Sequence, residues 1–506
     1  MDPTYNTHAR NPSSISDIPM KPPHGTSDGV DQGMTGQVHG HMMAPDDPDN
    51  PQNWPLHQKI YASAAATAFG FTVAFGLTAY TAGIPGIMSQ FNVSMTVAVA
   101  GMSLYFLGIV FAPIYTPHVV ERTGRTMVYL TTILVFALFT LGAGFSQDIS
   151  SLLACRFFAG LFGGPSLVLI EGTFADVWSA DVTVSYYAVL SLASYVGAGA
   201  GPIVGNFVVA VQGWRWAQWV TLMIALGALL LGIALPETYP REILRRRAKR
   251  RSFSITLAPA QSGVSLAEMS VTTIFQPLKM LVTEPIVIMS TLYLAFNFGV
   301  IFQFFISIPV VLNLTYAFGP RRIALAFTSA VGASFLAAIT AIIIDRLAFP
   351  KAHKKAQGRP VDIEYRMLPA MVGGVGITAS LFWIAWTADP KIPAAIPILG
   401  TALYVWGNMC VLISFVSYLF DAYPPAATLS ALTVAASTRL LFAAAFPLFI
   451  IPMIMRLTGA WAISTFGFIA AALMPFPWIL WAWGAGMRAR SSYNRCGAMG
   501  ASQGVA

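Results

Sequence analysis

The sequence predicts an all-α polytopic membrane protein with twelve transmembrane helices in two halves of six. Three observations predict this fold class: an apolar composition, a regular succession of apolar segments, and a one-sided distribution of basic residues. Of the 506 residues, 56% are hydrophobic and only 10% are charged, and the mean hydropathy is +0.65. Soluble globular domains carry about 25% charged residues, so the composition excludes a soluble fold.

The formal net charge of +8 does not indicate a nucleic-acid-binding protein. In a membrane protein, the placement of basic residues in the loops matters more than their sum. The three cysteines are too few for a disulfide framework, and Cys155 and Cys410 lie inside apolar segments. We therefore expect no nucleic-acid partner, no metal site and no cofactor.

Twelve apolar segments follow one another, each near the roughly 20 residues that a helix needs to cross a bilayer. The predicted spans are 60–84, 97–117, 127–147, 152–175, 184–210, 214–236, 286–312, 322–346, 367–388, 393–419, 428–454 and 459–484. They divide the chain into a disordered cytosolic tail (1–58), an N-terminal six-helix bundle (59–236), a basic cytosolic linker (237–284), a C-terminal six-helix bundle (285–486) and a cytosolic tail (487–506).

Basic residues predict the orientation, because cytosolic loops are enriched in Lys and Arg. If both termini are cytosolic, the linker alone carries Arg241, Arg245, Arg246, Arg247, Lys249, Arg250, Arg251 and Lys279. The predicted outer loops and their margins hold only Arg215, Arg321, Arg322, Lys391 and Arg456. The bias predicts that both termini face the cytosol.

A faint internal repeat supports two related halves. Gly108 precedes Glu121 by thirteen residues in the second span, and Gly332 precedes Asp345 by thirteen in the eighth. Coincidence is the alternative, because transporters built from repeated halves show only weak symmetry of this kind.

The fourth span carries two charges, Arg156 near its outer end and Glu171 near its inner end. Charges inside a membrane-length helix are rare and usually functional. At about 1.5 Å per residue the two lie roughly 22 Å apart along the axis, so each needs its own partner. Desolvation of a carboxylate favours protonation, which suits Glu171 as a proton carrier. The alternatives are an interfacial Glu171 and an Arg156 that snorkels to the outer surface.

Two further segments carry recognisable residue patterns. Glu121-Arg-Thr-Gly124-Arg125 follows the second span and forms a tight turn, in which an acid and a base can latch helix ends together. Asp176, at the inner end of the fourth span, is the natural extra partner for Arg125; charges that only anchor the topology are the alternative. The fifth span contains Gly197, Gly201, Pro202 and Gly205, a smooth face for close packing with a proline that bends the helix.

Together with Arg156-Phe-Phe-Ala-Gly160, Pro236-Glu-Thr-Tyr239 and Asp421-Ala-Tyr-Pro424, these patterns resemble the fungal twelve-spanner drug:proton antiporter family of the major facilitator superfamily. The resemblance implies that Arg156 contributes to proton coupling and that the kinked fifth helix is the antiporter element. Two positions depart from the family pattern: Val120 stands before the acid, and Asn206 stands where a second glycine is common.

Polar residues in the apolar second half are candidates for the substrate cavity, because lipid does not tolerate them unpaired. They are Tyr293, Asn297 and Gln303 in the seventh span, Tyr404 and Asn408 in the tenth, and Arg439 in the eleventh. Two sequons, at Asn92 and Asn313, fall in predicted outer loops close to the membrane and are candidate glycosylation sites.

We expect from these observations a proton-coupled exporter of small amphipathic compounds, such as xenobiotics or fungal secondary metabolites, driven by the proton gradient. No phosphate-binding loop supports direct ATP drive, and no hydrolase or metalloprotease motif predicts an enzyme. The alternatives are a polyamine or nutrient transporter on the same fold, and a non-transporting receptor. We expect a monomer in the plasma membrane, with the vacuolar membrane as the alternative address.

Overall fold

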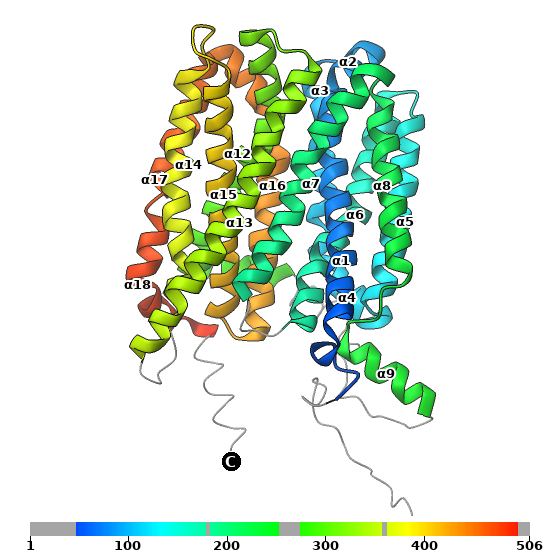
Figure 1. Ribbon diagram of the computed structural model, residues 1–506, viewed down its shortest axis with the longest axis vertical. Coiled ribbons are helices and arrows are strands. Elements are labelled where there is room, and N and C mark those ends of the chain that lie inside the picture. The colour runs from blue at the N-terminus through cyan, green and yellow to red at the C-terminus, as the bar shows by residue number, and fades with distance from the viewer. Residues whose placement is uncertain (1–46, 179–182, 252–273, 357–361, 494–506) are drawn as a thin grey trace, which may run out of the picture.

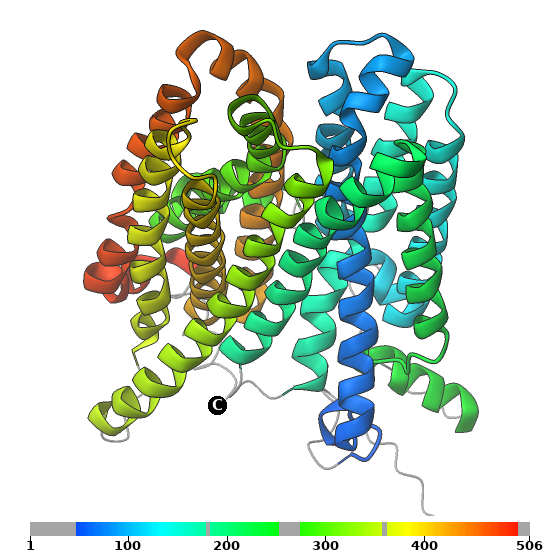
Figure 2. The same cartoon turned by 45° about the horizontal axis from the view of Figure 1, so that its top comes forward.

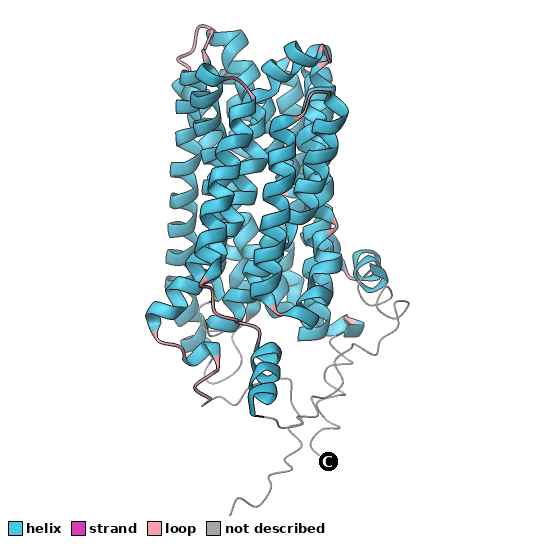
Figure 3. Cartoon of the chain, turned by 90° about the vertical axis from the view of Figure 1, so that its right-hand side faces the viewer, coloured by secondary structure: helices cyan, strands magenta, loops and turns pink. Residues whose placement is uncertain are grey.

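The computed structural model describes residues 47–178, 183–251, 274–356 and 362–493. Every regular element in these ranges is a helix (Figure 3). Backbone groups in lipid have no water to bond, so long apolar segments satisfy their own N–H and C=O groups as helices. The structure confirms the predicted fold class: eleven helical segments, or twelve with one bent pair, are long and apolar enough to cross a membrane.

The first half of the bundle runs from α1 to α8. Its elements are η1 (Pro51–Asn53), α1 (Leu56–Ala79), η2 (Tyr80–Gly83), α2 (Ile84–Phe91), α3 (Met95–Val110), α4 (Ala112–Thr123), α5 (Arg125–Phe145), α6 (Ile149–Val177), α7 (Thr183–Gln212) and α8 (Arg215–Ile233). Side-chain caps begin two of these helices: Asp148 accepts a bond from the backbone N–H of Ser151 at 2.8 Å, and Ser94 caps α3.

The second half runs from α12 to α18, after the linker helices α9 (Pro240–Arg251) and α11 (Gln276–Thr283). Its elements are α12 (Pro285–Tyr316), α13 (Pro320–Ala356), η6 (Ile363–Met367), α14 (Leu368–Thr387), α15 (Ala395–Ala422), α16 (Pro425–Leu457), α17 (Gly459–Leu473) and α18 (Phe476–Arg490). The start of α1 and the end of α18 lie at the same end of the bundle, here called the lower end (Figure 1).

The second predicted span and the loop after it differ in detail from the observed structure. The second span bends by 44° between α3 and α4, because Pro113 in the first turn of α4 cannot continue the hydrogen-bond ladder. Glu121 and Arg122, expected in a loop, belong to the last turn of α4. The loop shrinks to Gly124, and α5 begins at once with Arg125.

The two halves meet mainly along two helix pairs. α7 packs against α13, which runs beside it (Figure 2), and α3 packs against α16. At the centre the ring of Phe106 on α3 lies 4.6 Å from that of Phe302 on α12, in an edge-to-face contact. Gly199 on α7 lets Val331 on α13 approach so closely that an added Cβ would lie 2.7 Å from its Cγ2 atom.

Candidate functional site

A cavity of about 610 Å³ lies between the two halves. Helices α1, α3, α4, α6 and α7 line it from one half, and α12, α13, α15 and α16 from the other. Its wall is mostly apolar and includes Leu167, Leu190, Phe302, Phe305, Leu412 and Leu432. It extends to the lower end, where Glu121, Tyr239 and Tyr423 line it. The volume suits a small organic molecule.

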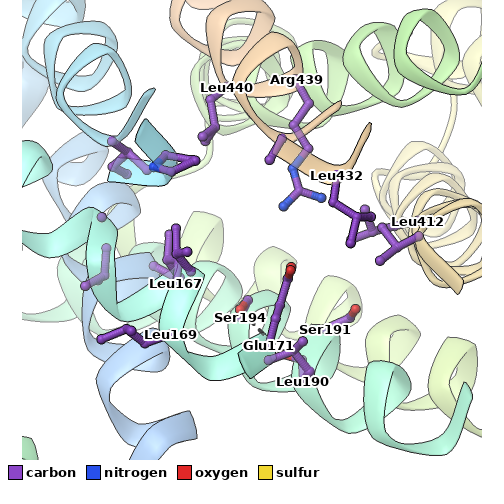
Figure 4. Close-up of a pocket in the computed structure, with 18 of the residues that line it drawn as sticks. Leu167, Leu169, Glu171, Leu190, Ser191, Ser194, Leu412, Leu432, Arg439 and Leu440 are labelled. Atoms are coloured by element: carbon purple, nitrogen blue, oxygen red, sulfur yellow. Dashed lines mark hydrogen bonds between the residues drawn. The ribbon is translucent and has the colours of Figure 1, made fainter. Parts of the chain in front are cut away.

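Two charged side chains face each other across this cavity. Glu171 projects from α6, on a wall that also presents Ser191 and Ser194 of α7, and Arg439 projects from α16 on the opposite side (Figure 4). Their nitrogen and oxygen atoms form no ion pair within 4.0 Å. The cavity therefore holds opposite charges with space between them.

Arg439 has few contacts for a guanidinium inside a membrane protein. The guanidinium carbon of Arg439 lies 5.3 Å from the ring centroid of Phe298, which is a cation–π contact. Its buried Nε atom has no hydrogen-bond partner. Fourteen residues separate Arg439 from the lower end of α16, which places it about 20 Å along that helix. It is thus in the middle of the bundle, where it lines the cavity.

Arg156 does not line the cavity. Its side chain is only 2% exposed, which excludes snorkelling to a surface. The guanidinium lies between the rings of Tyr80 and Tyr105, at 4.6 and 4.3 Å from their centroids. Its Nε, Nη1 and Nη2 atoms donate to the backbone oxygens of Gly101 (3.3 Å), Gly76 (3.0 Å) and Leu77 (3.3 Å). Arg156 therefore ties α6 to α1 and α3.

The residues of the predicted latch lie together at the lower end. Arg125 at the start of α5 forms an ion pair of 2.5 Å with Asp176 at the end of α6. Gly124 has φ = +83°, and a side chain there would collide with the carboxylate of Glu237. Among the described residues Glu121 belongs to no ion pair, and it faces the cavity instead. The Arg125–Asp176 ion pair thus joins α5 to α6 within one half, and Glu121 takes no part in it.

Two residues that the sequence analysis did not assign to the latch complete this region. Glu237 accepts bonds from the backbone N–H of Arg125 (2.9 Å) and of Thr126 (3.4 Å), so it caps the start of α5. Tyr239 packs against the Arg125 guanidinium, 5.6 Å from its ring centroid. Burial raises the pKa of the Tyr239 phenol. The sequence signal for these two residues was the Pro236-Glu-Thr-Tyr239 segment, which the sequence analysis used only as part of a family resemblance.

The second half repeats this arrangement. Arg366, in η6 just before α14, forms ion pairs with Asp345 of α13 (2.8 Å) and with Asp421 at the end of α15 (3.0 Å). This is the counterpart of Arg125 with Asp176. The glycines of the proposed internal repeat do not correspond, however. Gly108 contacts the backbone of α6, whereas a Cβ on Gly332 would meet nothing within 4 Å.

The glycines of the fifth span pack α7 against α1. A Cβ on Gly201 would lie 2.7 Å from the backbone nitrogen of Ala79, and one on Gly197 would lie 2.7 Å from the carbonyl oxygen of Phe71. Gly205 likewise faces the Ala79 carbonyl. Helix α7 continues through Pro202, whose carbonyl accepts a bond of 2.8 Å from the Asn206 amide.

Of the six predicted cavity residues, Arg439 lines the cavity and the other five do not. Tyr293, Asn297, Gln303, Tyr404 and Asn408 are buried between helices. Tyr404 and Asn408 both donate to the carbonyl oxygen of Asn297, each at 2.9 Å. Tyr404 and Asn408 thus find partners inside the protein. The Tyr293 hydroxyl, the Asn297 side-chain oxygen and both polar atoms of the Gln303 amide are buried without a hydrogen-bond partner. A direct substrate contact by any of the five remains a prediction.

Asn408 also connects the two halves. Its side-chain oxygen accepts a hydrogen bond from the hydroxyl of Tyr195, which lines the cavity from α7.

The two sequons lie at the end opposite to the lower end. Asn92 is an exposed helix cap with φ = 52°. Asn313, expected in a loop, lies instead in the last turn of α12, where its amide donates to the carbonyl of Phe318 at 3.1 Å.

Within the described ranges, no group of three or more His, Cys, Asp or Glu side chains could hold a metal ion.

A helical membrane bundle whose two halves enclose one cavity has the architecture of a membrane transporter. A family model described as "Major Facilitator Superfamily" matches residues 66–447. The chain belongs to the major facilitator superfamily, and its family and relatives are transporters, not enzymes.

Relatives with assigned names are fungal transporters. "Polyamine transporter 4" of Saccharomyces cerevisiae is 31% identical and aligns over 89% of this chain and 72% of its own length. "MFS-type efflux pump MFS2" of Trichophyton rubrum is 32% identical over 89% and 76%. "Efflux pump FUB11" of Gibberella moniliformis is 31% identical over 95% and 83%. These names agree with the predicted fungal transporter family.

A solved structure supports the fold. The proton:xylose symporter XylE bound to 6-bromo-6-deoxy-D-glucose covers 84% of this chain and 96% of its own, with a TM-score of 0.58 at 17% identity. The chain is therefore an integral, multi-pass membrane transporter of the major facilitator fold.

Proposed function

We propose that this protein is a proton-coupled exporter of small amphipathic compounds that works by alternating access. The observation that carries the proposal is the apolar cavity between the halves, with Glu171 on one wall and Arg439 on the other. The apolar wall accommodates the body of a substrate. The two charges line the cavity in which a substrate would bind, and one of them, the Glu171 carboxylate, can also bind a proton.

Coupling in this proposal depends on Glu171. A carboxylate in a cavity can alternate between a charged form that contacts substrate and a protonated form that does not. Protonation also removes the negative charge that faces Arg439. Substrate and proton then exclude each other at Glu171, which is the requirement for antiport. Arg156 touches no carboxylate and would act on coupling only through the positions of α1 and α3.

The lower end faces the cytosol in this proposal. Helix α9 lies at this end (Figure 1) and carries the exposed basic residues Arg245, Arg246 and Lys249, as expected for the inner surface. Because the cavity lining extends to this end, the structure corresponds to a state open toward substrate in the cell. Glu121, Arg125 and Asp176 then latch this end when the cavity faces outward. We place the chain in the plasma membrane as a monomer that needs no cofactor.

The charges of the lining argue against a polyamine as the substrate. Glu121 and Glu171 supply two negative charges, but Arg125 and Arg439 supply two positive ones. A polycation needs a clear excess of carboxylates to replace its hydration. The name of the yeast relative makes polyamine transport the second candidate. Competition by spermidine would support it, and the balanced lining predicts none.

The test is transport into proteoliposomes with an imposed pH gradient and a lipophilic fluorescent dye. The wild-type protein should accumulate the dye against its gradient. Glu171→Gln should lose gradient-driven accumulation but keep dye exchange without a gradient, because only the proton site is removed. Asp389→Asn makes the same chemical change in an exposed loop and should behave as wild type. Full gradient-driven accumulation by Glu171→Gln would contradict the coupling assignment.

A further inference from the structure

The surroundings of Arg156, Arg125 and Arg439 differ. Arg156 has three carbonyl partners and two aromatic rings. Arg125 has the carboxylate of Asp176. Arg439 has one aromatic ring, a buried Nε atom without a hydrogen-bond partner, and no ion pair within 4.0 Å. A guanidinium within a membrane span is costly unless a partner or ligand compensates it. Arg439 is half-buried and lines the cavity, so its guanidinium is available to a molecule that enters there.

Glu171 limits what that partner can be. It faces Arg439 across the cavity, so the space between them lies in the field of a fixed dipole (Figure 4). An anion alone would pair with Arg439 but would be repelled by Glu171. A cation alone would pair with Glu171 but would be repelled by Arg439. A molecule with a positive and a negative group satisfies both side chains at once.

Size and lining add the remaining chemistry. The guanidinium presents a planar fork of donors that matches a carboxylate, and Phe298 covers one face of it. Glu171 offers two acceptor oxygens for an ammonium or another strong donor. The neighbouring wall, with Phe302, Phe305 and Leu432, is apolar. A cavity of about 610 Å³ leaves room for an aromatic or aliphatic body beside the two polar ends.

We propose that the cavity selects net-neutral dipolar molecules, in which an ammonium or equivalent donor binds Glu171, a carboxylate or equivalent acceptor binds Arg439, and an apolar body packs on α12. This inference rests on the proposed function, because it names the substrate class of the same cavity. It also explains how a balanced pair of charges can bind substrate and still release it when Glu171 takes up a proton.

The experiment uses four probes that share one phenyl body and differ in charge: phenylalanine, hydrocinnamate, phenethylamine and hydrocinnamamide. Their equilibrium binding to the full-length protein in lipid nanodiscs is measured by calorimetry at neutral pH without a pH gradient. The wild-type protein should bind the zwitterion about tenfold more tightly than either singly charged probe, the factor given by roughly 1.4 kcal/mol for one lost pairing. The uncharged amide should bind with intermediate or weaker affinity.

Variants assign each end of the ligand. Arg439→Gln should abolish the preference for phenylalanine over phenethylamine, since both then bind only Glu171. Glu171→Gln should abolish the preference for phenylalanine over hydrocinnamate. Arg322→Gln, a cation at the opposite end of the bundle from the lower end, should change neither preference. Thermal unfolding of each variant verifies that the bundle is intact.

Several results would overturn the inference. Tightest binding of hydrocinnamate would show a simple anion site at Arg439, and tightest binding of the uncharged amide would show that neither charge contacts the ligand. Equal affinities for all four probes in the wild-type protein and in both cavity variants would likewise show that neither charge contacts the ligand. The dye assay separates this failure from that of the proposed function. Gradient-driven dye flux with no dipolar preference refutes only the substrate class, whereas absence of any gradient-driven flux refutes the transport cycle.

Discussion

Individual residues in this transporter are best understood from the partners that the fold provides. Arg156 and Arg439 look alike in the sequence, since each is an arginine within an apolar span. The first is enclosed by carbonyl oxygens and tyrosine rings, and the second faces a cavity. The same guanidinium thus holds helices together in one place and is available to a ligand in the other.

Replacing Arg156 tests its structural contribution. Arg156→Leu removes three hydrogen bonds from a charged donor, each of which contributes about 1.5–3 kcal/mol. We expect a large fall in the thermal unfolding midpoint of the purified protein, and Arg156→Lys should recover only part of it. Arg439→Leu, which loses no intramolecular hydrogen bond, should be nearly as stable as wild type. An Arg156→Leu variant with normal stability but no gradient-driven flux would instead indicate a direct coupling role.

Gly124 is a second residue with a sharp expectation. Its φ of +83° and the adjacent Glu237 carboxylate leave no room for a side chain. Gly124→Ala should destabilise the protein by roughly 1–2 kcal/mol or more, because a left-handed conformation is unfavourable for alanine and the cap of α5 must shift. The midpoint of chemical unfolding measures this. Gly319→Ala, in an open loop with nothing within 4 Å, is the matched control.

Helices in this bundle are held by close backbone contact as much as by apolar side chains. In lipid there is little hydrophobic gain from bringing two helices together, so small residues that allow close packing matter more. Helix α7 shows this on two sides. Gly197, Gly201 and Gly205 face α1 in the same half, while Gly199 faces α13 in the other.

The contact of α7 with α1 predicts the effect of one added methyl group. Gly201→Ala places a Cβ 2.7 Å from the nitrogen of Ala79 and 2.9 Å from the oxygen of Phe75. This overlap should cost roughly 1–3 kcal/mol, as overpacking of a core does. Gly227→Ala on α8, where a Cβ meets nothing, should be neutral or gain up to about 1 kcal/mol from helix propensity. Equal thermal midpoints for the two variants would contradict the observed packing.

At the scale of the whole molecule, the two halves are joined by few elements and can move relative to each other. The main contacts between the halves are those of α7 with α13 and of α3 with α16, and smaller contacts join α7 to α15 and α4 to α16. The cavity lies between these helices. Each half has its own charged cluster at the lower end, Arg125 with Asp176 and Arg366 with Asp345 and Asp421. These clusters tie helices within a half rather than across the cavity. Rocking of the halves can therefore leave both intact.

A crosslink tests the contact between the halves. An ideal Cβ on Gly199 lies 3.9 Å from the Cβ of Val331, within the range of roughly 3.5–4.5 Å for disulfides. Gly199→Cys with Val331→Cys, in a chain whose own cysteines are replaced, should form a disulfide on mild oxidation. A protease site inserted between residues 252 and 273 reveals it, because only the crosslinked halves stay together on a denaturing gel.

The control pairs Gly199→Cys with a cysteine at Gly332, which is one residue farther along α13 and faces open space. This pair should crosslink much more slowly. Efficient crosslinking of the control, or none in the test pair, would show that the register of α7 against α13 differs from the described one. Reduction should restore two separate fragments in the test pair.

The sequence by itself determined the fold class, the spans and the family, because bilayer thickness, backbone hydrogen bonding and a few glycine and charge patterns act locally along the chain. Only the tertiary structure decided which polar groups face the cavity. Asn297, Tyr404 and Asn408 bond to one another or to the backbone, whereas Glu171 and Arg439 come from helices far apart in the sequence and meet across the cavity. The placement of these two charges on opposite walls depends on how helices from the two halves pack, and periodicity within a single helix carries no information about it.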